Sequence, residues 1–466
     1  MIKSKSSQNL AVLTITAIGL LIYSNAFTAG FCNDDYKMIV DNPAVKSLRL
    51  VPIWDAFNTR LLTGLSFALN YHFGGLNPSG YHAVNVFIHI FNAILVFYFV
   101  LLTFKTPFLK DNRLSAHANL LALSSALIFL AHPVQTEGVT FVTQRAVSLA
   151  SFFYLATLVL YIKSRLAMKE HYFAAAFVTA LFAMLTKEMA MTLPVMIIIY
   201  ESFFFGPFKK TDTPRLKRIF AFLLTLPLVP LLLRFDTLVS VLQLRWQIAE
   251  FDWRYFWTEI NVIRTYLGLL FLPVNQQLHR DYPLAGGLFE WPTALSFALI
   301  LGLLMWAVYL FKKERVLSYA IAWFFTTMFM ECAHVCFVHF GVIYEHWLYL
   351  PMAGFSLFIS VGLFKILQEE KKFKLCLLIL VLGFSFLTFQ RNKIWQNEIT
   401  LWMDHLRTSP DNYVAIFGLG FGYEQKGDYE KAIRYYKKAI ELNPKYSKAY
   451  FYLGALLQKI NRQKTQ

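Results

Sequence analysis

Long apolar runs separated by short polar segments occupy most of the chain between residues 10 and 389. A helix needs about 20 mainly apolar residues to cross the hydrocarbon core of a bilayer. The pattern therefore predicts an all-α, polytopic membrane bundle with about 11 spans. We place the spans near residues 10–29, 82–104, 115–131, 145–162, 172–186, 189–205, 219–233, 291–311, 316–333, 347–366 and 374–389.

The first run follows Lys3 and Lys5 but has no convincing small-x-small cleavage site, so we interpret it as a retained anchor. Lys and Arg then gather in five segments between runs, at residues 105–113, 163–169, 209–218, 312–315 and 365–374. Basic loops concentrate on the cytoplasmic side. All five lie on that side if segment 256–273 does not cross, and Glu259, Arg264 and Pro273 interrupt or stop that segment.

Composition agrees with a membrane protein. The 466 residues are 57% hydrophobic and 15% charged, with a mean hydropathy of +0.47. The net charge of +16 is spread over separate loops without a basic patch interleaved with aromatic residues. We therefore attribute the charge to topology and expect no nucleic-acid partner. The four cysteines are too few and too scattered for a disulfide framework.

The last part of the chain, 393–466, has a different pattern, because it is charged and helical. Pro410 recurs 34 residues later as Pro444, and Leu419–Gly420 recurs as Leu453–Gly454. This spacing is typical of tetratricopeptide repeats, and 413–446 forms one complete repeat. We therefore divide the chain into a membrane domain, 1–392, and a short repeat domain, 393–466. So short an array must pack on the membrane domain or on a partner protein.

With this topology, the side opposite the basic loops collects unusual polar residues. Ionisable residues at the ends of spans are costly and commonly functional. A mixture of acids and bases on one side suggests an anionic substrate and proton transfer. The residues are Asp34, Asp35, His132, Glu137, Arg145, Lys187, Glu188, Arg280, Asp281, Glu345 and His346.

A polar stripe, His82, Asn85, His89 and Asn92, follows one face of the second span. Hydrogen bonding between helices is the favoured interpretation of this stripe. The alternative is that His82, which lies nearest the mouth of the bundle, contacts the substrate.

Several motifs occur in a characteristic order. They are "DD" after the first run, "NYHFGGLNPSGYHAVNVFIH", "HPVQTEGV" followed by "QR", "TKEMAMTLP", "EHWLYLP" and the terminal repeats. Together they resemble the transmembrane-and-tetratricopeptide-repeat glycosyltransferases of the GT-C superfamily, including bacterial relatives, over nearly the whole chain. The resemblance implies a polyprenyl-linked sugar donor, a phosphate or diphosphate, transfer on the extracytoplasmic face, and catalysis by Asp34 and Asp35. Two departures are Leu61 after Arg60, where relatives have proline, and His346, where many have arginine.

Transfer of a sugar from a lipid phosphate needs a base, compensation of the phosphate charge and oriented hydroxyl groups. Asp34 or Asp35 would be the base of an inverting reaction. If their loop is extended, the two side chains point to opposite sides and have separate tasks, and we prefer Asp35 as the base. For the donor phosphate we expect Arg145, Lys187, Arg280 and His346, with Arg145 best placed. For substrate binding or site shape we expect His82, His132, Glu137, Glu188, Asp281 and Glu345.

No cofactor is required by this chemistry, and a divalent metal ion that bridges the donor phosphate stays an open alternative. The acceptor we expect is a protein hydroxyl, and the alternatives are a glycolipid or a surface polysaccharide. A non-enzymatic membrane scaffold that recruits a protein partner through its repeats is a further alternative. We expect a multi-pass protein of the bacterial inner membrane, surrounded by membrane lipid, with the site and the repeats on the periplasmic side.

Overall fold

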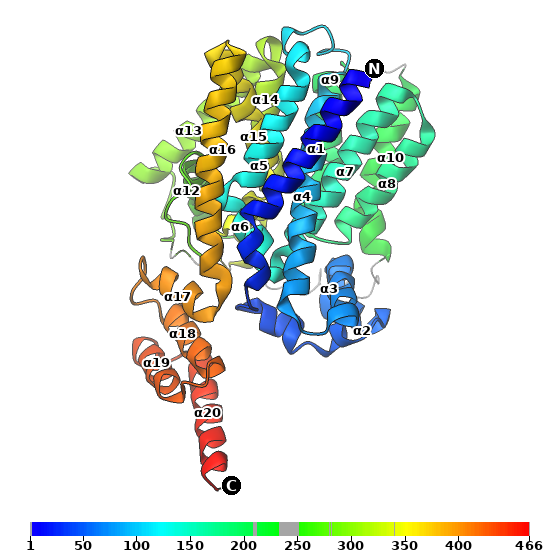
Figure 1. Ribbon diagram of the computed structural model, residues 1–466. Helices are drawn as coiled ribbons and strands as arrows, with labels where there is room; N and C mark the ends of the chain where they lie inside the picture. The colour runs from blue at the N-terminus through cyan, green and yellow to red at the C-terminus, as the bar shows by residue number, and fades with distance from the viewer. Residues whose placement is uncertain are drawn as a thin grey trace.

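The computed structural model describes residues 2–207, 212–232, 251–278, 280, 282–339 and 341–465. In this part of the chain all regular structure is helical. Figure 1 shows an elongated bundle with a small group of helices projecting from one end. The bundle contains α1 (Ile2–Ile22), α4 (Pro78–Thr103), α5 (Ala118–Ala131), α7 (Arg145–Ala167), α8 (Glu170–Met184), α9 (Leu193–Phe204), α10 (Thr213–Leu232), α12 (Trp253–Phe271), α13 (Trp291–Lys313), α14 (Arg315–Val338), α15 (Pro351–Leu367) and α16 (Glu370–Asn392).

Each predicted apolar run coincides with one of these helices, as far as they are described. Six helical stretches among the described residues are long and apolar enough to cross a membrane. Three shorter apolar helices accompany them, so the predicted count of about 11 spans is not confirmed. The six stretches are Pro78–Thr103, Arg113–Ala131, Val142–Ala167, Trp291–Lys313, Arg315–Phe337 and Glu370–Gln396.

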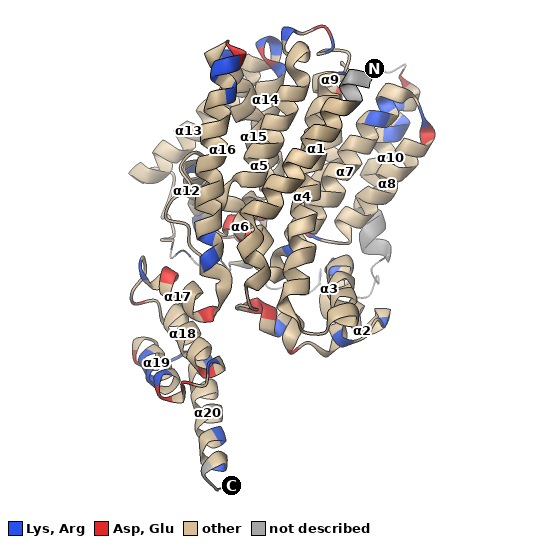
Figure 2. Ribbon diagram, viewed as in Figure 1, with Lys and Arg blue, Asp and Glu red and all other residues tan. Residues whose placement is uncertain are grey.

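The two ends of the bundle differ in charge and in what they carry. Lys and Arg lie at the upper ends of α10 and α16 in Figure 2, the end at which the chain begins. We call this the basic end. The opposite end, which we call the repeat end, carries α17 (Glu398–Leu406), α18 (Tyr413–Gln425), α19 (Tyr429–Leu442) and α20 (Ser447–Thr465), together with α2 (Leu50–Phe57) and α3 (Leu61–Gly74).

Helix α12 covers the segment that we expected not to cross. The Asp252 N–H, just before α12, donates to the carbonyl of Cys336 near the repeat end of α14 (3.2 Å). At the other end of α12, the Leu270 carbonyl lies 3.0 Å from Nε2 of His132, directly after α5. Helix α12 therefore begins and ends toward the repeat end, as the expected topology requires.

The polar stripe on α4 binds neighbouring helices inside the bundle. Asn85 Nδ2 donates to the Val139 carbonyl (3.0 Å), and a ring nitrogen of His89 lies 3.1 Å from the Leu130 carbonyl. Asn92 Nδ2 donates to a carbonyl of α7 at 2.8 Å. Because these side chains are buried and paired, they stabilise the bundle instead of contacting lipid. This confirms the interpretation as interhelical hydrogen bonds for Asn85, His89 and Asn92.

The repeat helices are attached to the segment that follows α1. The Gly30 N–H donates to the Gln396 carbonyl (3.0 Å), and Gln396 Nε2 donates to the Asn25 carbonyl (2.7 Å). The Trp395 ring stacks on Phe141 with a centroid distance of 5.2 Å. Repeats this few need a neighbouring surface, and the loop after α1 supplies it.

The placement of α12 predicts the accessibility of the loop that follows it. Starting from a variant without the native cysteines, we expect a membrane-impermeant maleimide to modify Leu284→Cys from the same side as Lys445→Cys in the repeats. Leu284 is 42% exposed, so a cysteine at this position is accessible to the maleimide. Lys312→Cys should react only after permeabilisation. Modification of positions 284 and 312 from one common side would overturn the non-crossing placement of α12.

Candidate active site

The acidic pair lies directly after the first helix, at the repeat end. Asp35 is 1% exposed; its Oδ2 accepts from the Cys32 N–H (3.0 Å) and its Oδ1 from the Thr143 N–H (2.8 Å). Burial raises the pKa of Asp35 to about 7, although both hydrogen bonds oppose the shift. A pKa near 7 would suit a general base, but both oxygens are already occupied by backbone donors.

Asp34 has the opposite environment, because it is exposed while its neighbour is buried. The backbone here is helical and continues into a π-helix, Tyr36–Val40, so the extended loop assumed from the sequence is wrong. Adjacent helical residues still point in different directions. Asp34 is near enough to His346 and Tyr344 to influence their pKa values.

Glu137 and His346 form a buried pair beside Asp34. Nδ1 of His346 lies 2.7 Å from Oε1 of Glu137, and the main-chain N–H of His346 donates to Oε2 (3.0 Å). Burial lowers the pKa of the His346 imidazole well below its ordinary value. In a neutral ring whose Nδ1–H donates to Glu137, Nε2 is free to act as a hydrogen-bond acceptor. His346 therefore supplies no positive charge for a phosphate.

Two ion pairs complete the cluster. Nζ of Lys187 lies 2.8 Å from Oε1 of Glu331, and these side chains are only 7% and 12% exposed. Nη2 of Arg60 lies 3.1 Å from Oε2 of Glu188, with both side chains partly exposed. Lys187, Arg60 and Glu331 all influence the pKa of His346, as Asp34 does. Cations and acids from distant parts of the chain thus converge around one histidine.

The ion pair with Arg60 also strongly affects the pKa of Glu188. Burial alone would raise the pKa of Glu188, but Arg60 and the hydroxyl of Thr59 lower it to about 2. Glu188 is therefore ionised at any physiological pH and serves to orient Arg60.

Arg145 does not reach this cluster. It is fully buried; Nε donates to Asn85 Oδ1 (2.6 Å), and its other nitrogens donate to the carbonyls of Ser66 (3.1 Å) and Tyr81 (3.0 Å). The guanidinium also lies 4.7 Å from the centroid of the Phe67 ring. With its donors used inside the protein, the geometry does not support the expected phosphate contact. Arg145 instead holds α3, α4 and α7 together.

Both predicted histidines outside the cluster are buried. His82 is 1% exposed, and among the described residues neither of its ring nitrogens has a hydrogen-bond partner. His132 is also buried; its Nδ1 accepts from the Val134 N–H (3.2 Å), and its Nε2 lies 3.0 Å from the Leu270 carbonyl of α12. These contacts favour positioning of the backbone over direct substrate binding for His132.

The remaining predicted residues lie around the loop after α12. Glu345 accepts from Nε2 of Gln276 (2.7 Å) and from the N–H of Gln277 (2.6 Å), and burial raises its pKa to about 7. Glu345 therefore fixes this loop. Arg280 is partly exposed and donates to the Asn275 carbonyl (2.7 Å), so no contact places it in the cluster. Asp281 lies outside the described residues.

Three residues of the cluster were not among the predicted site residues: Arg60, Glu331 and Tyr344. Glu331 could have been found, because an acid within an apolar span is a functional signal. Arg60 appeared only as a departure from the pattern of relatives. No group of three or more His, Cys, Asp or Glu side chains in the described ranges is arranged to hold a metal ion. We derive no step through a metal.

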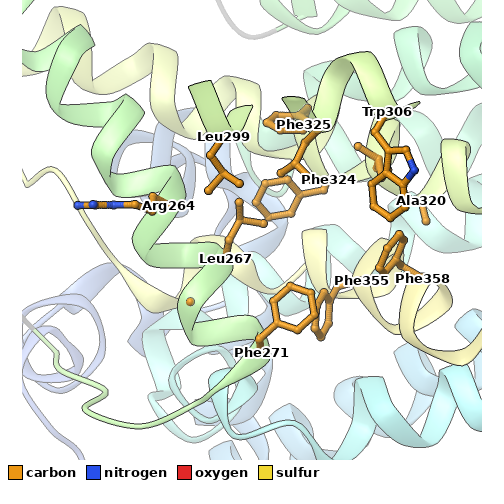
Figure 3. A pocket seen from close by; sticks show the side chains of 13 residues that line it. Arg264, Leu267, Phe271, Leu299, Trp306, Ala320, Phe324, Phe325, Phe355 and Phe358 are labelled. Carbon is orange, nitrogen blue, oxygen red and sulfur yellow. The ribbon is translucent and has the colours of Figure 1, made fainter. Parts of the chain in front are cut away.

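An apolar groove of about 470 Å³ lies along α12, α13, α14 and α15. Figure 3 shows its aromatic lining, which includes Phe271, Phe324 and Phe355. Arg264 lies at the edge, and its side chain points away from the rings (Figure 3). The Phe271 end adjoins, along the chain, the loop that Glu345 holds.

The chain is similar to known proteins both in its repeats and along nearly its whole length. Tetratricopeptide-repeat models match residues 413–446 and 435–466, which confirms the predicted repeat. Human protein O-mannosyl-transferase TMTC3 is 27% identical over 98% of this chain and 54% of its own length. Human protein O-mannosyl-transferase TMTC4 is 27% identical over 91% of this chain and 65% of its own length. The Drosophila melanogaster protein O-mannosyl-transferase Tmtc3 is 25% identical over 97% and 57%, respectively.

These matches extend along nearly the whole chain, including the membrane helices and the first repeats. The chain is therefore similar along nearly its whole length to relatives named protein O-mannosyl-transferases, which agrees with the resemblance that its motifs indicated. It spans about half the length of TMTC3, 54%. No solved structure gives a significant match to the chain.

The environment of Arg145 predicts a structural defect on substitution. Arg145→Ala leaves buried acceptors without a donor, and each such group costs about 1–3 kcal/mol. We expect a clearly lower thermal unfolding midpoint in detergent, with part of the loss recovered in Arg145→Lys. An Arg145→Ala protein of unchanged thermal stability that requires much more lipid donor would restore the phosphate role.

Proposed function

We propose that this chain is an integral-membrane glycosyltransferase that moves a sugar from a polyprenyl-phosphate-type lipid to a protein hydroxyl. The observation that carries this proposal is the exposed carboxylate of Asp34 at the repeat end, together with the buried Glu137–His346 pair and the ion pairs Lys187–Glu331 and Arg60–Glu188. The named activity of the relatives, protein O-mannosyl transfer, supports the reaction and makes mannose the sugar we propose.

In the proposed step, the carboxylate of Asp34 takes the proton of an acceptor hydroxyl as its oxygen attacks the anomeric carbon. The bond from that carbon to the phosphate oxygen breaks, and the lipid phosphate leaves with the electron pair. Attack opposite the leaving group inverts the anomeric centre without a covalent enzyme intermediate. The proton on Asp34 is returned to water, and a polyprenyl phosphate is the second product.

The neighbouring groups have separate tasks in this proposal. Lys187 and Arg60 compensate the charge on the leaving phosphate, because they are the cations whose charges act on the pKa of His346. Nε2 of His346 accepts a hydrogen bond from a sugar hydroxyl. Asp35 holds the loop, so Asp34 replaces it as the preferred base. A base must reach the acceptor, and Asp35 is buried between two backbone donors.

The apolar groove along α12–α15 supports a lipid-linked donor. Its rings offer a dry surface for an isoprenoid chain, and it lies among helices that face lipid, since α13 is only 11% buried in its most apolar window. A lipid held there with its phosphate toward the cluster would need no passage through water. We place the cluster and the repeats on the extracytoplasmic side, opposite the basic end.

A glycolipid or polysaccharide acceptor is the second candidate, and the same chemistry would serve it. The repeat helices favour a protein, because repeats of this kind present extended surfaces for binding. A scaffold without activity is the third candidate. It gives no reason for an exposed acid to be held beside a buried His–Glu pair.

The division of tasks in the acidic pair gives a test of the proposal. Asp34→Asn should reduce transfer from polyprenyl-phosphate mannose by at least about 100-fold, the range of a lost general base. Its thermal midpoint should stay near that of the unchanged protein, because Asp34 is exposed. Asp35→Asn should lower the thermal midpoint, because its amide NH₂ would face a backbone N–H and leave it unpaired, at about 1–3 kcal/mol.

Transfer rates at saturating donor and unfolding midpoints, both measured on purified protein, separate the two variants. Asp411→Asn is the matched control, since Asp411 is an exposed acid at the repeat end that does not line the cavity beside Asp34, and it should keep its turnover within about twofold. If Asp34→Asn keeps normal turnover in folded protein, Asp34 is not the base. Absence of transfer by the unchanged protein would favour the scaffold.

A further inference from the structure

A second cavity, of about 420 Å³, lies between the loop after α1 and the repeat helices. We call it the loop–repeat cleft. One wall is the loop, with Asp34, Tyr36 and Lys37, and the other is formed by α17, α18 and the start of α20. Its volume lies within the usual range for a ligand site. None of the sequence motifs singled out this cleft, because its walls are far apart in the chain.

Asp34 belongs both to the cleft and to the cluster around His346. It lines the cleft, and its charge also acts on the pKa values of His346 and Tyr344. A molecule in the cleft would therefore lie against the proposed base. His346 and Lys187 do not line the cleft, so the acceptor and the donor phosphate would occupy different places.

The lining of the cleft combines aromatic rings with charged side chains. Tyr36 and Phe421 meet edge to face across the two walls, with centroids 5.0 Å apart. Nζ of Lys448 lies 5.1 Å from the centroid of the Phe417 ring, which is nearly buried. Aromatic rings beside exposed charges are typical of surfaces that bind polypeptides.

The cleft is also fixed in position relative to Asp34. The carboxylate of Glu398 is 4% exposed; it accepts from the Asn33 N–H, next to Asp34, and from Nε1 of Trp402, both at 2.5 Å. Asn33 has a positive φ of 49°, which permits the sharp turn into the acidic pair. A buried carboxylate held by two donors is a rigid connection, so repeat helix and base form one unit.

A glycolipid fits this cleft poorly. Its walls belong to the repeats and the loop instead of the apolar bundle helices, and Lys37, Asp41 and Lys448 are all exposed. The lining mixes aromatic rings with charged side chains, so an acyl chain would have no continuous apolar surface there. An extended polypeptide suits the lining, because its side chains can pack on Tyr36 and Tyr452 while its backbone stays hydrated.

We propose that the loop–repeat cleft binds the acceptor as an extended polypeptide segment and delivers its Ser or Thr hydroxyl to Asp34. This inference rests on the proposed function and adds the chemical class of the acceptor and the surface that selects it. The repeats are then part of the substrate site, and Lys448, Tyr452 and Val414 determine acceptor affinity without taking part in the chemical step.

Binding can be measured without turnover by using the Asp34→Asn protein as the background. The probe is a fluorescein-labelled peptide of about 12 residues, alternating Ser or Thr with Val, long enough to cross the cleft in an extended conformation. We expect Lys448→Glu, and Val414→Trp, which fills the cleft, each to raise its Kd by at least about tenfold, or 1.4 kcal/mol. The matched controls are Lys445→Glu and Leu457→Trp, which lie on the repeats but do not line the cleft; their Kd should stay within about twofold.

The same substitutions in the active protein give a second, independent measurement. We expect a raised KM for the peptide, an unchanged kcat and unchanged use of polyprenyl-phosphate mannose. Equal effects in the cleft variants and their controls, or an unchanged peptide Kd in the cleft variants, would overturn the cleft while leaving the glycosyltransferase proposal intact. Transfer to a glycolipid in vesicles but to no peptide would overturn the acceptor class. If the unchanged protein binds the peptide normally but transfers no sugar, the proposed function alone is overturned.

Discussion

A buried carboxylate must be hydrogen-bonded, and Asp35 satisfies this constraint by joining two loops that are distant in the sequence. It accepts one N–H from Cys32 in its own loop and one from Thr143 (2.8 Å), just before α7. Leaving either donor unpaired would cost about 1–3 kcal/mol. The position of the exposed neighbour, Asp34, follows from this anchoring. The remaining features of the site are arranged around that one side chain.

Polar groups of the candidate site occur in pairs instead of singly. Glu137 accepts from the neutral ring of His346, Glu331 pairs with Lys187 and Glu188 pairs with Arg60. A buried charge without a partner is costly, so the buried cation Lys187 is stabilised by an acid, and the exposed cation Arg60 is oriented by one. A donor phosphate would then join a neutralised network whose side chains are already oriented, which reduces the reorganisation required in the transition state.

The repeats have a structural role in this arrangement as well as a proposed binding role. Glu398 ties α17 to Asn33 beside the acidic pair, and Gln396 is bonded to the segment that leads there. Relatives extend well beyond the length of this chain, since it covers 54% of human TMTC3. The first repeats alone already form one wall of the loop–repeat cleft, so the cleft is complete within the described residues.

Much of the fold follows from local patterns. Apolar runs, basic loops and the 34-residue spacing of Pro410 and Pro444 predict the helices and the repeat at 413–446 without reference to distant contacts. Some residues of the candidate site stand out in the sequence as polar residues at span ends: Asp34, Glu137, Lys187 and His346. Their individual roles could not be predicted. Whether Arg145 meets a phosphate or the carbonyls of Ser66 and Tyr81, and which aspartate is buried, depends on partners from other helices. Burial and hydrogen-bond partners are properties of the packed bundle, so only the tertiary structure decided them.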